Sequence, residues 1–157
     1  VNDIWGFKFD KKTALMTAKY NAACCLMHNK DEAVYNDFLE DMVSEMAECV
    51  KIAREAGVAD DKIMLDPGVG FGKTYEMNLA AINHVDVLHR LGFPILLGTS
   101  RKSVIGNTLN LPADQRVEGT LATSVIGVIK GCSFVRVHDV KENRRVIQMT
   151  EAILGRR

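Results

Sequence analysis

Two adjacent cations, Arg101 and Lys102, lie in the segment PILLGTSRKS at positions 94–103. The apolar run gives way at Gly98 to hydroxyl-bearing and basic side chains, so a buried strand would come to the surface there. Barrels and open α/β sheets gather their active sites at the carboxyl ends of parallel strands. The segment therefore predicts two cations at the rim of a functional site.

A second basic pair, Arg136 and His138, lies in the segment FVRVHD. Because side chains alternate along a strand, we expect this pair on one face, with Val135 and Val137 on the other. A guanidinium beside an imidazole suits an anion. The alternative is an edge strand with a solvated face, but the apolar character of GCSFVRV favours a buried strand and hence an anion site.

Asp66 opens a third polar segment, DPGVGFGKT, whose glycines permit unusual backbone dihedrals or a close approach of another backbone. The phosphate-binding pattern GxxxxGK[ST] would place lysine six positions after its first glycine, whereas Lys73 comes five after Gly68. The dinucleotide pattern GxGxxG does not fit either. A turn with a capping aspartate is the alternative to a ligand-binding loop.

The scaffold predicted for these segments consists of five strand–helix units. Short connections imply parallel strands and right-handed crossovers, typical of part of a (β/α)8 barrel or of a doubly wound sheet. No repeat or linker divides the chain, so we predict one domain, 1–157. The chain begins inside an expected strand without an initiator methionine, which indicates a piece of a longer protein. Helices are expected near 10–20, 35–56, 75–91, 115–130 and 141–154.

Composition excludes several classes of protein. Twenty basic residues balance 20 acidic ones among the 157 residues, so no bias toward nucleic acid or anionic membranes exists. No apolar run approaches the roughly 18 residues that span a bilayer, and we expect a cytoplasmic location. Cys24, Cys25, Cys49 and Cys132 lack CxxC spacing, so we expect buried thiols rather than a zinc site or a disulfide framework.

In their order and spacing, the motifs NDIWG, LMHN, DPGVGFGK, GTSRKS and FVRVHDV resemble the C-terminal part of the dihydropteroate synthase family. This is the pterin-binding transferase family of folate biosynthesis that sulfonamides inhibit. The resemblance implies an incomplete (β/α)8 TIM barrel of about five C-terminal strand-helix units. It also implies condensation of 6-hydroxymethyl-7,8-dihydropterin pyrophosphate with p-aminobenzoate to give dihydropteroate and pyrophosphate. A homodimer formed through the late barrel helices and Mg²⁺ accompanying the pyrophosphate are further implications, although no metal ligand set is evident.

The resemblance assigns four residues to the pterin. Asp66 would accept paired hydrogen bonds from the guanidine-like edge of the ring. Asn2 would be its amide partner, and Met27 would line the slot. Lys102 would contact the carbonyl edge of the ring opposite Asp66.

The same resemblance places p-aminobenzoate beside the SRKS loop. Ser103 and the start of the following helix would receive its carboxylate. Phe71 would form the apolar wall against its ring, with Gly70 in the same loop. Arg101 would shape the channel or pair across the mouth.

Pyrophosphate would be held by Arg136 and His138, where positive charge stabilises the departing anion. These two residues and Lys102 are the catalytic residues that we expect.

Two other functions remain open. Pterin-dependent corrinoid methyltransferases share the barrel but would not need the SRKS and RVHD segments. The second alternative is a truncated, non-catalytic fragment that binds pterin. It remains open because the family has three earlier strand–helix units before the position of Val1.

Overall fold

The computed structural model describes residues 1–156 and contains five short parallel strands. The first three form one sheet in the order β1-β2-β3, and β4 pairs with β5 in a second sheet. A parallel bridge between Leu65 and Ile95 joins the two sheets. The strands therefore follow one another in chain order, as in a barrel wall and unlike a doubly wound sheet. The strands are β1 (Asn2–Asp3), β2 (Cys24–Met27), β3 (Ile63–Asp66), β4 (Leu96–Leu97) and β5 (Phe134–Val135).

All five expected helical regions are helical, although one of them is divided and further short helices lie outside them. The expected helix near 75–91 is divided into an α-helix and a 3-10 helix, and the short helix α4 was not among the expected ranges. The α-helices are α1 (Lys11–Lys19), α2 (Phe38–Glu55), α3 (Tyr75–Asn83), α4 (Ser103–Leu109), α5 (Val117–Ile129) and α6 (Val140–Ile153). The 3-10 helices are η1 (Asp60–Lys62), η2 (Val85–Leu91) and η3 (Ala113–Gln115).

Helix α2 illustrates how local sequence determines an element and its buried face. The Asp37 carboxylate caps its amino end by accepting hydrogen bonds from two backbone N–H groups. Gly57 has φ of +93° just after its carboxyl end, the left-handed conformation typical of helix termination. Met42, Met46 and Cys49 are completely buried against the strands. The methionine-rich face is thus core, as its helical spacing predicts.

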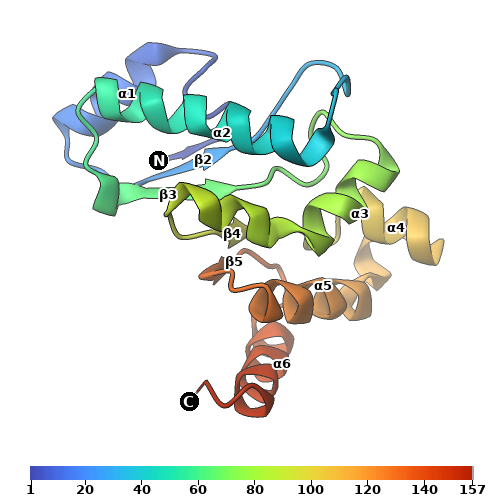
Figure 1. Cartoon of the computed structure of the whole chain (residues 1–157). Coiled ribbons are helices and arrows are strands. Elements are labelled where there is room, and N and C mark those ends of the chain that lie inside the picture. The colour runs from blue at the N-terminus through green and yellow to red at the C-terminus, as the bar shows by residue number, and fades with distance from the viewer. Residues whose placement is uncertain (157) are drawn as a thin grey trace.

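The helices form a layer on the outside of the strands (Figure 1). Successive helices touch, since α1 packs on α2, α2 on α3, α3 on α5 and α5 on α6. The main core lies between this layer and strands β2 and β3, whose side chains are mostly buried. The described cysteines are free thiols; Cys24, Cys25 and Cys49 are buried as expected, whereas Cys132 is half-buried. No helix within residues 1–156 has both the length and the apolar character needed to cross a membrane.

One expected strand is shorter than the sequence suggests. Strand β5 ends at Val135, and the pairing with β4 continues only as a hydrogen bond from the Arg136 N–H to the Leu97 carbonyl, at 3.1 Å. We expected side chains to alternate between the two faces of a strand as far as His138. This expectation is wrong, because the chain leaves the sheet before it reaches His138.

Candidate functional site

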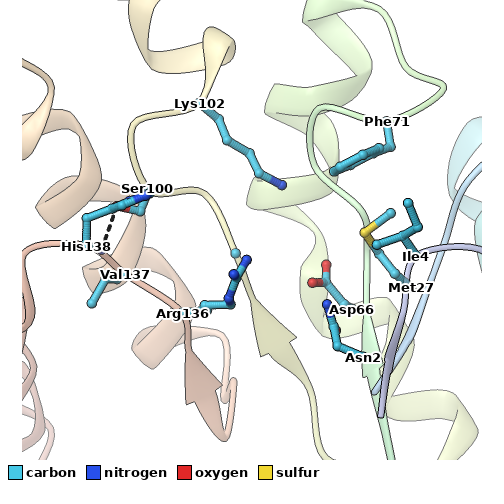
Figure 2. Close-up of a pocket in the computed structure, with 11 residues that line it drawn as sticks. Asn2, Ile4, Met27, Asp66, Phe71, Ser100, Lys102, Arg136, Val137 and His138 are labelled. Carbon is cyan, nitrogen blue, oxygen red and sulfur yellow. Dashed lines mark hydrogen bonds between the residues drawn. The ribbon is translucent and has the colours of Figure 1, made fainter. Parts of the chain in front are cut away.

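A pocket of about 230 Å³ lies at the carboxyl ends of the strands. Every strand or the loop after it contributes to its wall, which is the arrangement expected of a barrel site. Figure 2 shows the side chains of Lys102 and Arg136 pointing from the segments after β4 and β5 toward the region of the Asp66 carboxylate. The pocket is lined by Asn2, Ile4, Met27, Asp66, Phe71, Gly98, Ser100, Lys102, Arg136, Val137 and His138.

Asp66 forms the buried acidic group of this pocket. It is the last residue of β3, its side chain is only 7% exposed, and Oδ1 accepts a hydrogen bond from the Gly68 N–H at 2.7 Å. Burial raises the pKa of Asp66, and the Gly68 N–H and the charge of Lys102 oppose that shift. An ideal Cβ at Gly98 would lie 3.6 Å from Oδ2, so glycine keeps that oxygen uncovered. The second carboxylate oxygen is thereby available to a ligand.

The loop after Asp66 is folded tightly against the end of β2. Gly68 has φ of +67°, and a Cβ at this position would lie 1.9 Å from the carbonyl oxygen of His28. Glycine is therefore required there for close backbone approach. The amide oxygen of Asn78 accepts the Gly70 N–H, and the Tyr35 hydroxyl donates to the Gly72 carbonyl at 2.7 Å. Gly72 has φ of +53°, and a Cβ there would lie 2.4 Å from the carbonyl oxygen of Lys30, so close backbone packing accounts for Gly68 and Gly72 without any phosphate.

A buried polar relay supports the same loop from behind. The Lys73 ammonium donates to Nδ1 of His28 at 2.8 Å and to the carbonyl oxygens of Gly68 and Phe71 at 3.1 and 3.0 Å. His28 is completely buried, and its Nε2 donates to Glu45 on α2 at 2.9 Å. Burial lowers the pKa of Lys73 to about 7 and that of His28 to about 4. Lys73 thus anchors the loop, and no local pattern indicated its histidine partner.

Arg101 and Lys102 point in different directions despite their adjacency. Arg101 has φ of +59°, a left-handed turn that separates the two side chains. Its guanidinium leaves the pocket and pairs with both carboxylate oxygens of Asp139, at 2.7 and 3.2 Å. The Lys102 ammonium enters the pocket, donates to the Val69 carbonyl and lies 4.9 Å from the centroid of the Phe71 ring. Burial lowers the pKa of Lys102.

Arg116 holds this turn in place. Its Nη1 donates to the carbonyl oxygen of Arg101 at 2.8 Å, and its Nε donates to that of Leu111 at 2.9 Å. These bonds tie the strand-end loop to the start of α5. Arg116 is a supporting residue that the sequence analysis missed, because nothing in its local pattern distinguishes it from a surface arginine.

Arg136 and His138 line the side of the pocket that is formed by the segment after β5 (Figure 2). Both side chains are exposed, and within residues 1–156 the Arg136 guanidinium forms no hydrogen bond or ion pair. Nδ1 of His138 lies 2.9 Å from the hydroxyl oxygen of Ser100, which also accepts the backbone N–H of His138 at 3.1 Å. Val137 lines the pocket too, since the backbone no longer alternates as a strand here.

The structure brings together most of the predicted site residues and leaves three outside the pocket lining. Arg101 pairs with Asp139, Ser103 is the exposed first residue of α4, and Gly70 lies in the neighbouring loop. Ser100 and Gly98 were missed, although both stand in the quoted GTSRKS segment; their residue types alone gave no reason to select them. Those that line the pocket are Asn2, Met27, Asp66, Phe71, Lys102, Arg136 and His138.

Parallel strands in chain order, an outer helix layer and a pocket at the strand ends define an α/β protein of the barrel type with a ligand site. The pocket combines one buried carboxylate with the cations of Lys102 and Arg136, which suits a ligand that carries both an amidine-like edge and an anion. Residues 1–138 match the family described as pterin binding enzyme, and the chain belongs to that family.

Its relatives are dihydropteroate synthases, which are transferases. The synthase of Clostridium beijerinckii is 58% identical over 99% of this chain, and that of Bacillus subtilis is 52% identical over 99%. The crystal structure of the Clostridium difficile synthase in the presence of pteroic acid superposes with a TM-score of 0.95, at 47% identity over 98% of this chain. The Thermus thermophilus synthase in complex with 6HMPPP gives a TM-score of 0.90 at 35% identity over 97%.

The chain spans only part of these proteins. It covers 58% and 55% of the two curated synthases and 59% of the Clostridium difficile chain. The fold is therefore an α/β arrangement that matches part of the synthase barrel, with two open parallel sheets.

Proposed function

We propose that this chain carries the strand-end pocket of a dihydropteroate synthase. The reaction is the condensation of 6-hydroxymethyl-7,8-dihydropterin pyrophosphate with p-aminobenzoate. The observation that carries this proposal is the buried carboxylate of Asp66, which faces Lys102 and Arg136 across the pocket. A carboxylate of this kind accepts the paired N–H groups of a pterin, while the cations suit its carbonyl and the anionic leaving group.

In this mechanism Asp66 and Asn2 hold the guanidine-like edge of the pterin, and Lys102 donates to the opposite edge. Met27 lines the pterin slot, and Phe71, whose ring lies near the Lys102 ammonium, supplies the apolar wall for the ring of p-aminobenzoate. The pterin methylene is thereby aimed at Arg136 and His138. When the pterin pyrophosphate and p-aminobenzoate are both held in the pocket, their bimolecular reaction becomes effectively unimolecular.

The bond that breaks joins the pterin methylene carbon to the ester oxygen of the pyrophosphate group. Its electron pair leaves with pyrophosphate, and Arg136 and His138 stabilise the negative charge that develops there. The amine nitrogen of p-aminobenzoate forms the new bond to the methylene and then loses one proton. Ser103 at the start of α4 is the proposed contact for the p-aminobenzoate carboxylate. Gly70 lies in the loop beside the proposed place of the p-aminobenzoate ring. Arg101 acts through its ion pair with Asp139.

Mg²⁺ is expected to accompany pyrophosphate in this family. Within residues 1–156 no group of three or more His, Cys, Asp or Glu side chains is placed to hold a metal ion. Asp66 is the one carboxylate in the described pocket lining, and its Oδ1 already accepts the Gly68 N–H. The described residues do not fit a protein-held Mg²⁺, so no step above passes through the ion.

The sequential strand order supports the finer proposal that residues 1–157 form one domain and correspond to five units of a (β/α)8 barrel. We also propose a homodimer through the late helices. Apolar side chains on α5 and α6 are exposed, among them Ile129 at 47%, Met149 at 60% and Ile153 at 73%. Light scattering coupled to size exclusion tests this: a monomer at all concentrations would contradict it.

Calorimetric titration with a dihydropterin pyrophosphate analogue tests the proposed function. Asp66→Asn should weaken binding by about 10- to 100-fold, the usual range for hydrogen bonds to a charged group. Asp86→Asn removes a carboxylate far from the pocket lining and serves as the matched control, with unchanged affinity. Equal affinity in the wild type and Asp66→Asn would refute the pterin site. Binding without product formation when p-aminobenzoate is added would favour the non-catalytic fragment.

A corrinoid methyltransferase is the weaker alternative. Such an enzyme would need the pterin groups, but it would have no leaving pyrophosphate to occupy the wall formed by Arg136 and His138. Competition of inorganic pyrophosphate with the pterin pyrophosphate analogue separates the two functions, because the methyltransferase reading predicts no competition.

A further inference from the structure

The hydroxyl of Ser100 contacts both the imidazole ring and the backbone N–H of His138. Ser100 is 8% exposed and lies in the loop after β4, while His138 lies in the loop after β5. The two loops meet at this contact, which Figure 2 marks with a dashed line. The proposed reaction assigns no substrate contact to Ser100.

The Ser100 hydroxyl has few hydrogen-bond partners in the described structure. Oγ accepts the backbone N–H of His138 at 3.1 Å and lies 2.9 Å from Nδ1 of the same residue. A serine hydroxyl has one hydrogen to donate, and a nearly buried hydroxyl that donates to nothing is costly. Within residues 1–156 the acceptor recorded beside Oγ is Nδ1 of His138. Donation of the serine hydrogen to Nδ1 would satisfy this hydroxyl within the described structure.

A neutral imidazole carries one hydrogen, and the nitrogen that accepts a hydrogen bond is the one without it. If Nδ1 accepts from Ser100, the hydrogen of the neutral ring is on Nε2. That atom is on the side of the ring away from Ser100, and His138 is an exposed residue of the pocket lining. An Nε2–H at this place is a donor for an anionic oxygen.

We propose that Ser100 is a positioning residue that fixes His138 in the Nε2–H tautomer and so presents a hydrogen-bond donor to the leaving pyrophosphate. The inference rests on the proposed function, in which His138 faces that anion. Ser100 itself acts only through the imidazole. Its backbone contact with His138 fixes the place of the ring, and its hydroxyl hydrogen fixes the tautomer.

The test is nitrogen-15 NMR of the imidazole rings in the 157-residue chain, at a pH well above the ordinary imidazole range. A His138→Gln sample identifies the His138 signals among those of the four histidines. The wild type should show protonated Nε2 and unprotonated Nδ1. Ser100→Ala should give a mixture of tautomers, while Ser100→Thr should restore the wild-type pattern. Protonated Nδ1 in the wild type, or an unchanged tautomer in Ser100→Ala, would overturn the inference.

Titration with inorganic pyrophosphate provides the second readout. Ser100→Ala should weaken binding by about 3- to 10-fold, the net effect of roughly one hydrogen bond, and Ser100→Thr should recover the affinity. Thr99→Val is the control, because it removes the neighbouring buried hydroxyl, which contacts Thr123 instead of His138. An altered tautomer with unaltered pyrophosphate affinity would refute the positioning role. Failure of the wild type to bind pyrophosphate would count against the proposed anion site, whereas the NMR spectra still decide the tautomer.

Discussion

Acidification should destabilise this protein through one buried histidine. His28 is completely buried, and it faces Glu45 from α2, Lys73 from the loop after β3 and Lys8 from the segment after β1. Burial, followed by the charge of Lys73, lowers the pKa of its imidazole to about 4. The folded state therefore resists the proton that the unfolded chain accepts at about pH 6.5.

The sign and the size of the effect follow from this difference. A lowered pKa in the folded state means that the unfolded state binds more protons between pH 4 and 6.5, so stability rises with pH in this window. The contribution is complete above about pH 6.5 and is lost as the pH falls toward about 4. At about 1.4 kcal/mol per pKa unit, the interval from 6.5 to about 4 corresponds to about 3 kcal/mol.

The measurement is urea unfolding of wild type and His28→Gln by circular dichroism, at intervals from pH 7 to 4. Glutamine cannot titrate, yet its amide can donate to Glu45 and accept from Lys73. At pH 7 the variant should be less stable by about 1–3 kcal/mol because its hydrogen bonds are poorer. Between pH 7 and 4 it should lose about 3 kcal/mol less than the wild type. His84→Gln replaces an exposed histidine and should match the wild type. Equal losses in the wild type and His28→Gln would refute the reasoning.

Three further substitutions test other parts of the structure. Gly68→Ala should destabilise the chain by more than about 3 kcal/mol in urea unfolding, because a Cβ would meet a carbonyl oxygen at 1.9 Å on a backbone with positive φ. Met46→Ala should cost about 2–5 kcal/mol by leaving a cavity under α2, whereas Met149→Ala, at a side chain 60% exposed, should have little effect on the midpoint. Arg101→Gln should leave the calorimetric affinity for a pterin analogue unchanged, since its guanidinium pairs outside the pocket lining; a large loss would restore it as a direct ligand contact.

The strand–helix alternation could be predicted because periodicity is a local property. Apolar residues at helical spacing predicted α2, and Met42 and Met46 occupy the core as that spacing requires. The break of the third helical region at His84 could not be predicted, because the apolar pattern continues through Val85 and Leu88. The end of β5 was also missed, since β-branched residues continue beyond the last paired residue.

Some residues of the candidate site could also be predicted from local sequence, and others could not. Asp66 and Lys102 were identified from their places after apolar strands, and parallel strands bring such places together at one end. Ser100 gave no signal, because its significance lies in a contact with His138, 38 residues away along the chain. The relay of Lys73 through His28 to Glu45 is equally non-local.

The sequence by itself determined which elements form and which polar side chains stand at the strand ends, because both depend on residue type and near spacing. Only the tertiary structure decided where those side chains point. Arg101 and Lys102 are neighbours with similar charges, yet a left-handed turn at φ of +59° sends one to Asp139 and the other over Phe71. That turn is held by Arg116 from the start of α5. The direction of each cation thus depends on backbone dihedrals and distant partners, which no local pattern contains.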